Sequence, residues 1–239
     1  MYLTHTRPDI QFAVSALSQF MAEPRDQYWV VGKHILRYLW CTIAFGLTFT
    51  SSAGVMLQGF TDSDWAGSPV DRKSTSGYCF SLGSAMISWS SHKQGSIAQS
   101  TAEAEYIAEN NACREAVWLR KLVSGLFGEK LETTIIHCDN QSCIKLTKNP
   151  VFHDRSKHID LKYHYIKDML QRNVIKLKLC CKHRDNIANI ARYCDVNRPA
   201  ILSRYLSRYF GDIFPKISRY IANIIAIISF DSRKYRPYP

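Results

Sequence analysis

Three short acidic segments most constrain what this chain can fold into. They are Gly59–Gly67 (GFTDSDWAG), Ser100–Ala108 (STAEAEYIA) and His137–Ser142 (HCDNQS). The first and third follow apolar, strand-like runs. The second opens a long helical pattern with a capping box, in which Ser100 is followed three residues later by Glu103. The pattern therefore predicts carboxylates at two strand ends and on one helix.

Carboxylates placed in this way can converge, and converging carboxylates repel one another unless cations lie between them. Oxygen ligands of this kind suit Mg²⁺ or Mn²⁺. Two such ions can bind both the attacking and the leaving oxygen of a phosphoryl transfer. The three segments thus suggest a metal-dependent phosphoryl-transfer site.

Hydrophobic periodicity predicts an α/β fold after about residue 50, with a mixed five-stranded sheet and flanking helices. Before it, two helical patterns separated by Pro24 occupy residues 9–40. Gly125 and Gly128 are expected to end the longest helix. The expected strands are 48–60, 78–82, 85–89, 133–138 and 174–181, and the expected helices are 100–126, 141–147 and 159–172.

The ordered motifs resemble those of the ribonuclease H domain of copia-type LTR retrotransposon Pol polyproteins. The shared pattern is D-x-D-W-A-G, then S-T-x-E-A-E-Y, then D-N-Q-S. Residues 2–10 and 35–39 are similar to the end of the preceding reverse transcriptase, and residues 72–78 and 157–164 are similar to segments within the ribonuclease H module. The resemblance covers about residues 1–190.

The resemblance implies three parts of the chain. Residues 1–48 would be a helical remnant of the C-terminal (thumb/connection) region of the reverse transcriptase, and residues 49–190 a ribonuclease H-like domain. Residues 191–239 lie outside the family resemblance and form a basic, Arg/Tyr-rich tail. Arg-Tyr pairs can bind nucleic acid by charge and stacking, but a tail of accidental composition is the preferred interpretation.

The resemblance also implies the metal ligands. Asp62 would bridge both ions, and Asp139 would complete the shell of the first. Of the two helical glutamates, Glu105 fits the ligand position, because it precedes a large apolar residue and an alanine two residues later. Glu103 is better placed as the capping partner, and Asp64 is expected to support the site rather than bind metal.

The chemistry implied by the family is hydrolysis of the RNA strand of RNA–DNA hybrids during reverse transcription, with two Mg²⁺ (or Mn²⁺) ions. The partners would be the hybrid and the reverse transcriptase part of a Pol polyprotein. Recognition would follow the backbone and the RNA 2′-hydroxyls. Six residues are candidates for phosphate or sugar contacts, although each alone also fits a solvated surface position: Lys73, Lys93, Lys157, His158, Lys162 and His164.

The fourth ligand position departs from the family pattern, in which an aspartate stands in Q-x-A-D-x-x-T-K. Here Asn189 occupies that position and the threonine-lysine pair is absent. Asparagine keeps one oxygen but loses the charge, which weakens the second metal site. Asp185 lies one helical turn earlier and could replace the acid only after a backbone shift. We therefore expect low or absent activity.

Composition adds broad limits. The net charge of +11 suits a polyanionic partner, but the tail accounts for +6 of it, and a role in solubility alone is an alternative. Eight cysteines show no C-x-x-C spacing, so neither a zinc motif nor a disulfide framework is expected. No signal peptide and no membrane segment are expected, which predicts an intracellular protein of the cytoplasm or nucleus.

Two further interpretations remain open. The chain could be a catalytically inactive remnant, or a domesticated fragment that binds nucleic acid or protein, and Asn189 favours this class for present-day activity. An integrase-like nuclease on the same fold is a third possibility. The series of acidic motifs argues against it, because integrases space their acids differently.

Overall fold

The computed structural model describes residues 2–43, 46–47, 49, 56–68, 70–83, 85–128, 131–148 and 160–179, and only the backbone of 160–164. Asn189, Asp185, Lys157, His158 and the tail lie outside the described residues, as do the side chains of Lys162 and His164. The chain divides into two compact units, one including residues 1–49 and the other comprising residues 50–182. Across the described ranges, no helix is both long and apolar enough to cross a bilayer.

The described part of the first unit is helical, as the periodicity predicts. Two short 3₁₀ helices, η1 (Tyr2–His5) and η2 (Pro8–Ile10), precede α1 (Gln11–Ser18) and α2 (Asp26–Cys41). Their apolar faces bury Ile10, Ala13, Val31 and Ile35 in a small core.

One arginine ties the start of the first unit to the end of α2. The guanidinium of Arg7 binds the carboxylate of Asp9 at 2.7 and 3.0 Å. It also donates to the Thr42 hydroxyl at 2.6 Å and to the Thr42 carbonyl at 3.2 Å. The unit therefore has its own apolar core and its own polar link between distant residues.

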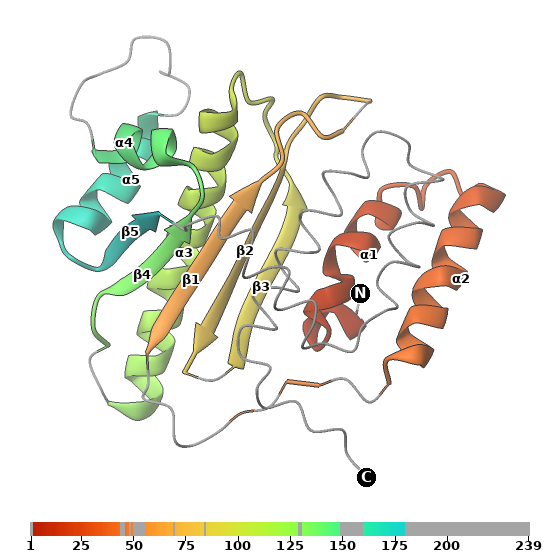
Figure 1. The fold of residues 1–239 in the computed structure, drawn as a ribbon, viewed down its shortest axis with the longest axis horizontal. Coiled ribbons are helices and arrows are strands. Elements are labelled where there is room, and N and C mark those ends of the chain that lie inside the picture. Colours follow the sequence, from red (N-terminus) through yellow and green to blue (C-terminus); the bar gives the residue numbers. More distant parts are fainter. Residues whose placement is uncertain are drawn as a thin grey trace. The chain divides into compact units, whose positions relative to one another are not determined.

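The second unit contains the predicted mixed sheet (Figure 1). The strand order is β3-β2-β1-β4-β5, with β1–β2–β3 antiparallel and β4 and β5 running parallel to β1. Together with the flanking helices, this arrangement is that of a ribonuclease H-like α/β fold. The strands are β1 (Leu57–Ser63), β2 (Thr75–Leu82), β3 (Ala85–Lys93), β4 (Thr134–Cys138) and β5 (Ile175–Leu179).

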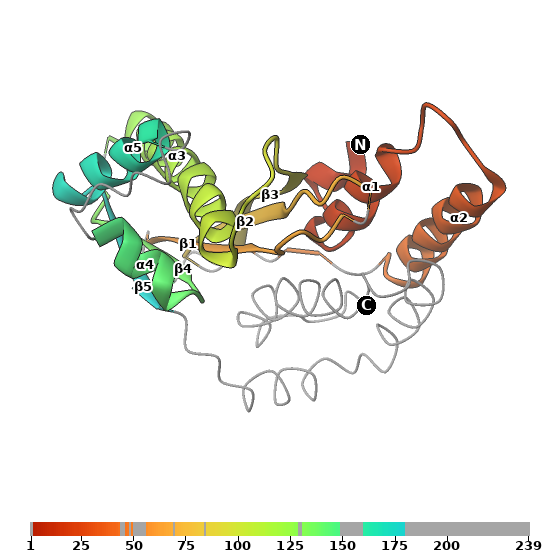
Figure 2. The same ribbon diagram turned by 90° about the horizontal axis from the view of Figure 1, so that it is seen from above.

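Within the described residues, three helices accompany the sheet: α3 (Thr101–Phe127), α4 (Gln141–Lys148) and α5 (Asp160–Gln171). The long α3 packs against β1 and β2, and α5 packs beside it (Figures 1 and 2). The predicted capping box is present at the start of α3, since the Glu103 amide donates to the Ser100 hydroxyl at 3.2 Å. The Glu103 carboxylate reaches back to the Gln99 amide at 2.9 Å.

The end of α3 was only partly predicted. Gly128 ends the helix in the left-handed conformation, with φ of 70°. Gly125 lies inside the helix, so the expectation that it helps to end α3 is wrong. Many helices end with one glycine in the left-handed conformation, and in α3 this residue is Gly128.

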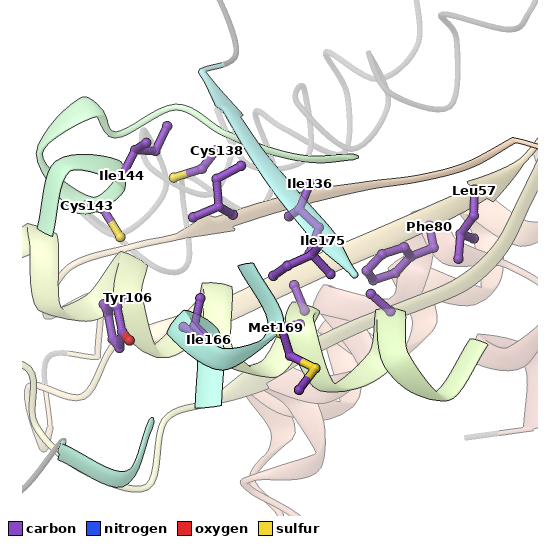
Figure 3. Close-up of a cluster of buried hydrophobic side chains, with 14 of the residues drawn as sticks. Leu57, Phe80, Tyr106, Ile136, Cys138, Cys143, Ile144, Ile166, Met169 and Ile175 are labelled. Carbon is purple, nitrogen blue, oxygen red and sulfur yellow. The ribbon is translucent and has the colours of Figure 1, made fainter. Parts of the chain in front are cut away.

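An apolar core lies between the sheet and α3, α4 and α5. Figure 3 shows Leu57 and Phe80 at one end of this core, and Cys138, Cys143 and Ile144 at the other. Because burial of large apolar side chains is the main stabilising term in folding, this core holds the sheet and helices in place. Its fully buried members include Phe80, Tyr106, Ala112, Cys113, Ala116, Ile136, Cys138, Cys143 and Ile166.

Strand boundaries differ from the predictions where pairing extends into polar sequence. The described part of β1 runs from Leu57 to Ser63, so Asp62 lies within the strand instead of following it. At this end of the sheet, Ser63 of β1 still pairs with Ser76 of β2, and Ser76 pairs with His92 of β3. These polar ends show no apolar pattern, and backbone hydrogen bonding alone extends the strands through them.

We predict that Gly59→Ala destabilises the second unit by about 1–3 kcal/mol. A Cβ at Gly59 would collide with the ring of Phe80, which is fully buried and has no room to move. Urea unfolding measures the change. The control is Gly125→Ala, where an added Cβ meets no atom within 4 Å. It should be neutral or stabilise α3 by up to about 1 kcal/mol. Equal stability of the two variants would contradict the packing described here.

Candidate active site

Parallel pairing of β1 with β4 places two of the predicted acids at the same end of these central strands. Phe60 pairs with His137, and the two rings stack with centroids 4.8 Å apart. Asp62 lies two residues further along β1, on the same side as the Phe60 ring by the alternation of a strand, and Asp139 directly follows the end of β4. The ends of the two central strands thus bring these carboxylates to neighbouring positions.

Glu105 reaches the same edge from the second turn of α3. Its Oε1 accepts a hydrogen bond from the amide of Ser63, next to Asp62, at 3.3 Å. A carboxylate oxygen of Glu105, a carboxylate oxygen of Asp139 and the Cys138 Sγ all lie within 4.8 Å of one another. The structure therefore brings together the three acids singled out in the sequence.

The environment of Glu105 strongly disfavours its charged form. The residue is only 6% exposed, and Oε2 is buried with no hydrogen-bond partner in the described structure. Burial, together with the nearby charges of Asp62 and Asp139, raises the pKa of Glu105 to about 9. Without a cation, Glu105 is therefore neutral near pH 7.

These donors fit a divalent cation. The buried Oε2 has no hydrogen-bond partner among the described residues, and two further carboxylates lie beside Glu105. Carboxylate oxygens of this kind suit Mg²⁺ or Mn²⁺, and bound cations would remove the mutual repulsion. Asp62, Glu105 and Asp139 are the residues that would hold such ions.

The rest of the first acidic motif supports the loop after β1. The amide of Asp64 donates to the Thr75 carbonyl at 3.1 Å, and the amide of Thr75 donates to the Asp64 carboxylate. A Cβ at Gly67 would collide with that carboxylate, which explains the glycine. The indole of Trp65 donates to the Ala98 carbonyl at 3.1 Å, which links this loop to the segment before α3.

One residue that positions the site was missed in the sequence. The side-chain amide of the buried Gln94 donates to the Ala104 carbonyl at 2.9 Å and to the Ser76 hydroxyl at 2.8 Å. These bonds hold the first turn of α3, just before Glu105, against β2. Gln94 lies in a polar loop outside every motif, so no local signal marks it.

Two of the six predicted nucleic-acid contacts are fully described. Asp62 of β1 pairs with Gly77 of β2, which pairs with Ser91 of β3. Lys93, two residues after Ser91, therefore lies at the same end of the strands as the carboxylates. Its ammonium contacts Asp71 at 2.9 Å, and Lys73 lies in the same loop as Asp71. Both lysines are half-buried, and the position of Lys93 at the end of the sheet that carries the acids is consistent with its predicted phosphate contact.

Comparison with known proteins decides the family. The chain is 39% identical over 188 residues to the "Retrovirus-related Pol polyprotein from transposon RE2" of Arabidopsis thaliana, which covers 79% of this chain. It is 42% identical over 172 residues, or 72% of this chain, to the corresponding polyprotein from transposon TNT 1-94 of Nicotiana tabacum. The chain belongs to the copia-type retrotransposon Pol family.

This copia-type Pol chain spans 13% of the length of each of these two relatives. No protein-family model matches it. Among solved structures, LC11-RNase H1 in complex with an RNA/DNA hybrid aligns with a TM-score of 0.40 and 14% identity, covering 54% of this chain and 87% of that one. The fold assignment rests on the strand order and helices described above.

We predict that Glu105 makes the stability of the metal-free Pol chain depend on pH. Its pKa rises on folding from an ordinary value of 4.5 to about 9. Its stabilising contribution is therefore fully present below about pH 4.5 and is lost as the pH rises toward 9. In EDTA, the Tm of the wild type should fall more between about pH 6 and about pH 8.5 than that of Glu105→Gln. Equal slopes would show that Glu105 is not buried beside other acids.

Proposed function

We propose that this retrotransposon ribonuclease H-like domain has the ancestral activity of hydrolysing the RNA strand of RNA–DNA hybrids. One observation carries the proposal: Glu105, with a buried unpartnered oxygen, converges with Asp62 and Asp139 at the end of the central strands. The homology to transposon Pol polyproteins supports it, since those relatives are named as retrovirus-related. The natural partner would be the reverse transcriptase part of the polyprotein, inside the cell in the cytoplasm or nucleus.

The protein's own residues divide the work as follows. Asp62, Glu105 and Asp139 would hold two Mg²⁺ or Mn²⁺ ions, which would activate the attacking water and stabilise the leaving 3′-oxygen when bound. Glu105 must release its proton to act as a ligand, because burial and the two aspartates keep it neutral otherwise. Gln94 and the Asp64 loop would hold α3 and β1 in position, so that the carboxylates need no rearrangement.

The hybrid would approach across the edge of the sheet that carries Lys73 and Lys93. Because three acidic groups repel the phosphate backbone, cationic side chains nearby are needed for binding. Contacts to phosphates and 2′-hydroxyls carry little base specificity. We therefore propose recognition of the shape and chemistry of the hybrid, with no preference for sequence.

Asn189 sets the level of activity in this proposal. A neutral amide at the fourth ligand position weakens the hold on the second ion, and even changes outside the ligand shell cost about 10–100-fold. Activity far below that of a four-acid site follows. A protein that only binds its partner is the second candidate, and the Asn189 substitution is the observation that favours it.

The test is cleavage of an end-labelled RNA–DNA hybrid by the full chain, in Mg²⁺ and in Mn²⁺. We expect slow cleavage by the wild type and at least about tenfold faster cleavage by Asn189→Asp, because the restored charge strengthens the second ion. Asp62→Asn should lower the rate by at least about 100-fold, because it removes a ligand charge.

Asp168→Asn is the matched control, because Asp168 is a partly exposed acid on α5 that pairs only with Arg172 among the described ion pairs. It should cleave like the wild type. Duplex DNA should remain intact in every reaction. Cleavage that survives Asp62→Asn would contradict the assignment of the site, and silence of both the wild type and Asn189→Asp would leave binding as the function.

A further inference from the structure

A second group of potential ligands lies deeper in the core than the three acids. Glu109, Cys138 and Cys143 each offer an atom within 4.8 Å of the other two, and all three residues are buried. Glu109 is 1% exposed and both cysteines are 0% exposed. They come from α3, from the end of β4 and from the first turn of α4. Figure 3 shows the two cysteines at the same end of the apolar core.

The carboxylate of Glu109 is poorly satisfied for a buried acid. Its Oε2 accepts a hydrogen bond from the Thr147 hydroxyl at 3.2 Å, but its buried Oε1 has no hydrogen-bond partner among the described residues. The neighbouring Cys138 and Cys143 thiols only partly offset the effect of burial, which raises the pKa of Glu109. The described ion pairs include none that involves Glu109. An acid of this kind costs free energy unless it binds a positive group or stays neutral. The orphaned oxygen faces a region that contains two thiols.

We propose that Glu109, Cys138 and Cys143 bind a thiophilic divalent ion, with Zn²⁺ as the best match. Zinc binds thiolates at about 2.3 Å and carboxylates at about 2.0–2.2 Å, usually in a tetrahedron. Two sulfurs on such an ion lie about 3.8 Å apart. The observed atoms therefore need to approach by no more than about 1 Å, which small side-chain rotations supply.

Binding would release the thiol protons and leave two thiolates and one carboxylate on the ion. The ion would satisfy the orphaned Glu109 oxygen and compensate its charge. It would also join α3, β4 and α4. Glu105 lies one helical turn before Glu109, and Asp139 directly follows Cys138, so the ion would stiffen the elements that carry both acids.

This site differs in chemistry from the carboxylate site, because soft thiolates select zinc whereas the oxygen set suits Mg²⁺ or Mn²⁺. The proposal does not depend on hybrid cleavage. Sequence patterns gave no sign of it: the cysteines lack C-x-x-C spacing, and Glu109 lies nearly thirty residues before Cys138. Only the fold brings the three together.

The test is titration of the reduced, metal-free full chain with Co²⁺ as a spectroscopic probe, followed by displacement with Zn²⁺. We expect a near-ultraviolet thiolate-to-cobalt charge-transfer band. The band should disappear in Cys143→Ala, and the affinity for Zn²⁺ should fall at least about tenfold in Glu109→Gln. Zn²⁺ should also raise the Tm of the wild type.

Two controls separate this site from other thiols. Cys79→Ser alters a buried cysteine on β2, and a double change of Cys180 and Cys181 to serine removes the adjacent pair in the sequence. Both should keep the band. Absence of the band in the wild type, or its loss only in the Cys180/Cys181 variant, would overturn the proposal.

X-ray absorption at the zinc edge provides a measurement that requires no variant to fold. The zinc-loaded wild type should show two sulfur neighbours at about 2.3 Å and oxygen at about 2.0–2.2 Å. A shell without sulfur, or with nitrogen and a single sulfur, would also overturn the assignment.

Discussion

The parallel pairing of β1 with β4 in the middle of the sheet determines where the other features of the second unit lie. Phe60 pairs with His137, so Asp62 near the end of β1 and Asp139 just after β4 lie at the same end of the central strands. Parallel neighbours need a long connection between them, and here β2, β3 and α3 form it. Because α3 packs back across β1, its second turn meets the end of that strand, where the Ser63 amide binds Glu105.

The resulting arrangement opposes the stability that the core provides. A carboxylate that is 6% exposed, beside two other acids, is unfavourable in its charged form. The apolar core around Phe80, Tyr106 and Ile136 stabilises the fold that holds it. Hydrogen bonds add to this stabilisation, since Gln94 binds the start of α3 and Asp64 binds Thr75 beside the loop after β1. Buried acids with perturbed pKa values of this kind cluster at functional sites.

The sequence allowed much of the fold to be predicted, because its patterns are local. The alternation of strands and helices gave the mixed sheet, and the Ser100–Glu103 capping box marked the start of α3. Strand ends were harder to predict, since β1 continues through Asp62 to Ser63 by backbone pairing that side chains do not signal. Gly125 and Gly128 looked alike as helix ends, and only the backbone conformation distinguishes them.

The residues of the candidate site that belong to sequence motifs were predicted, and those outside the motifs were not. Asp62, Glu105 and Asp139 were singled out from short motifs, and the structure brings their side chains together; their role as ligands remains a prediction. Gln94 and Glu109 were not found, because their importance comes from burial and from contacts with distant residues. The fourth position, Asn189, lies outside the described residues, and its effect is predicted from the residue type.

The central claim is that three acids share a site which binds divalent cations and in which Glu105 is neutral until they bind. Calorimetric titration of the chain with Mg²⁺ near pH 7, in buffers of different ionisation enthalpy, counts the protons released. The account predicts that about 0.5–1 proton leaves per protein on binding, and that Glu105→Gln releases none. Binding heats that do not depend on the buffer would contradict it, because the acid would then already be charged in the metal-free protein.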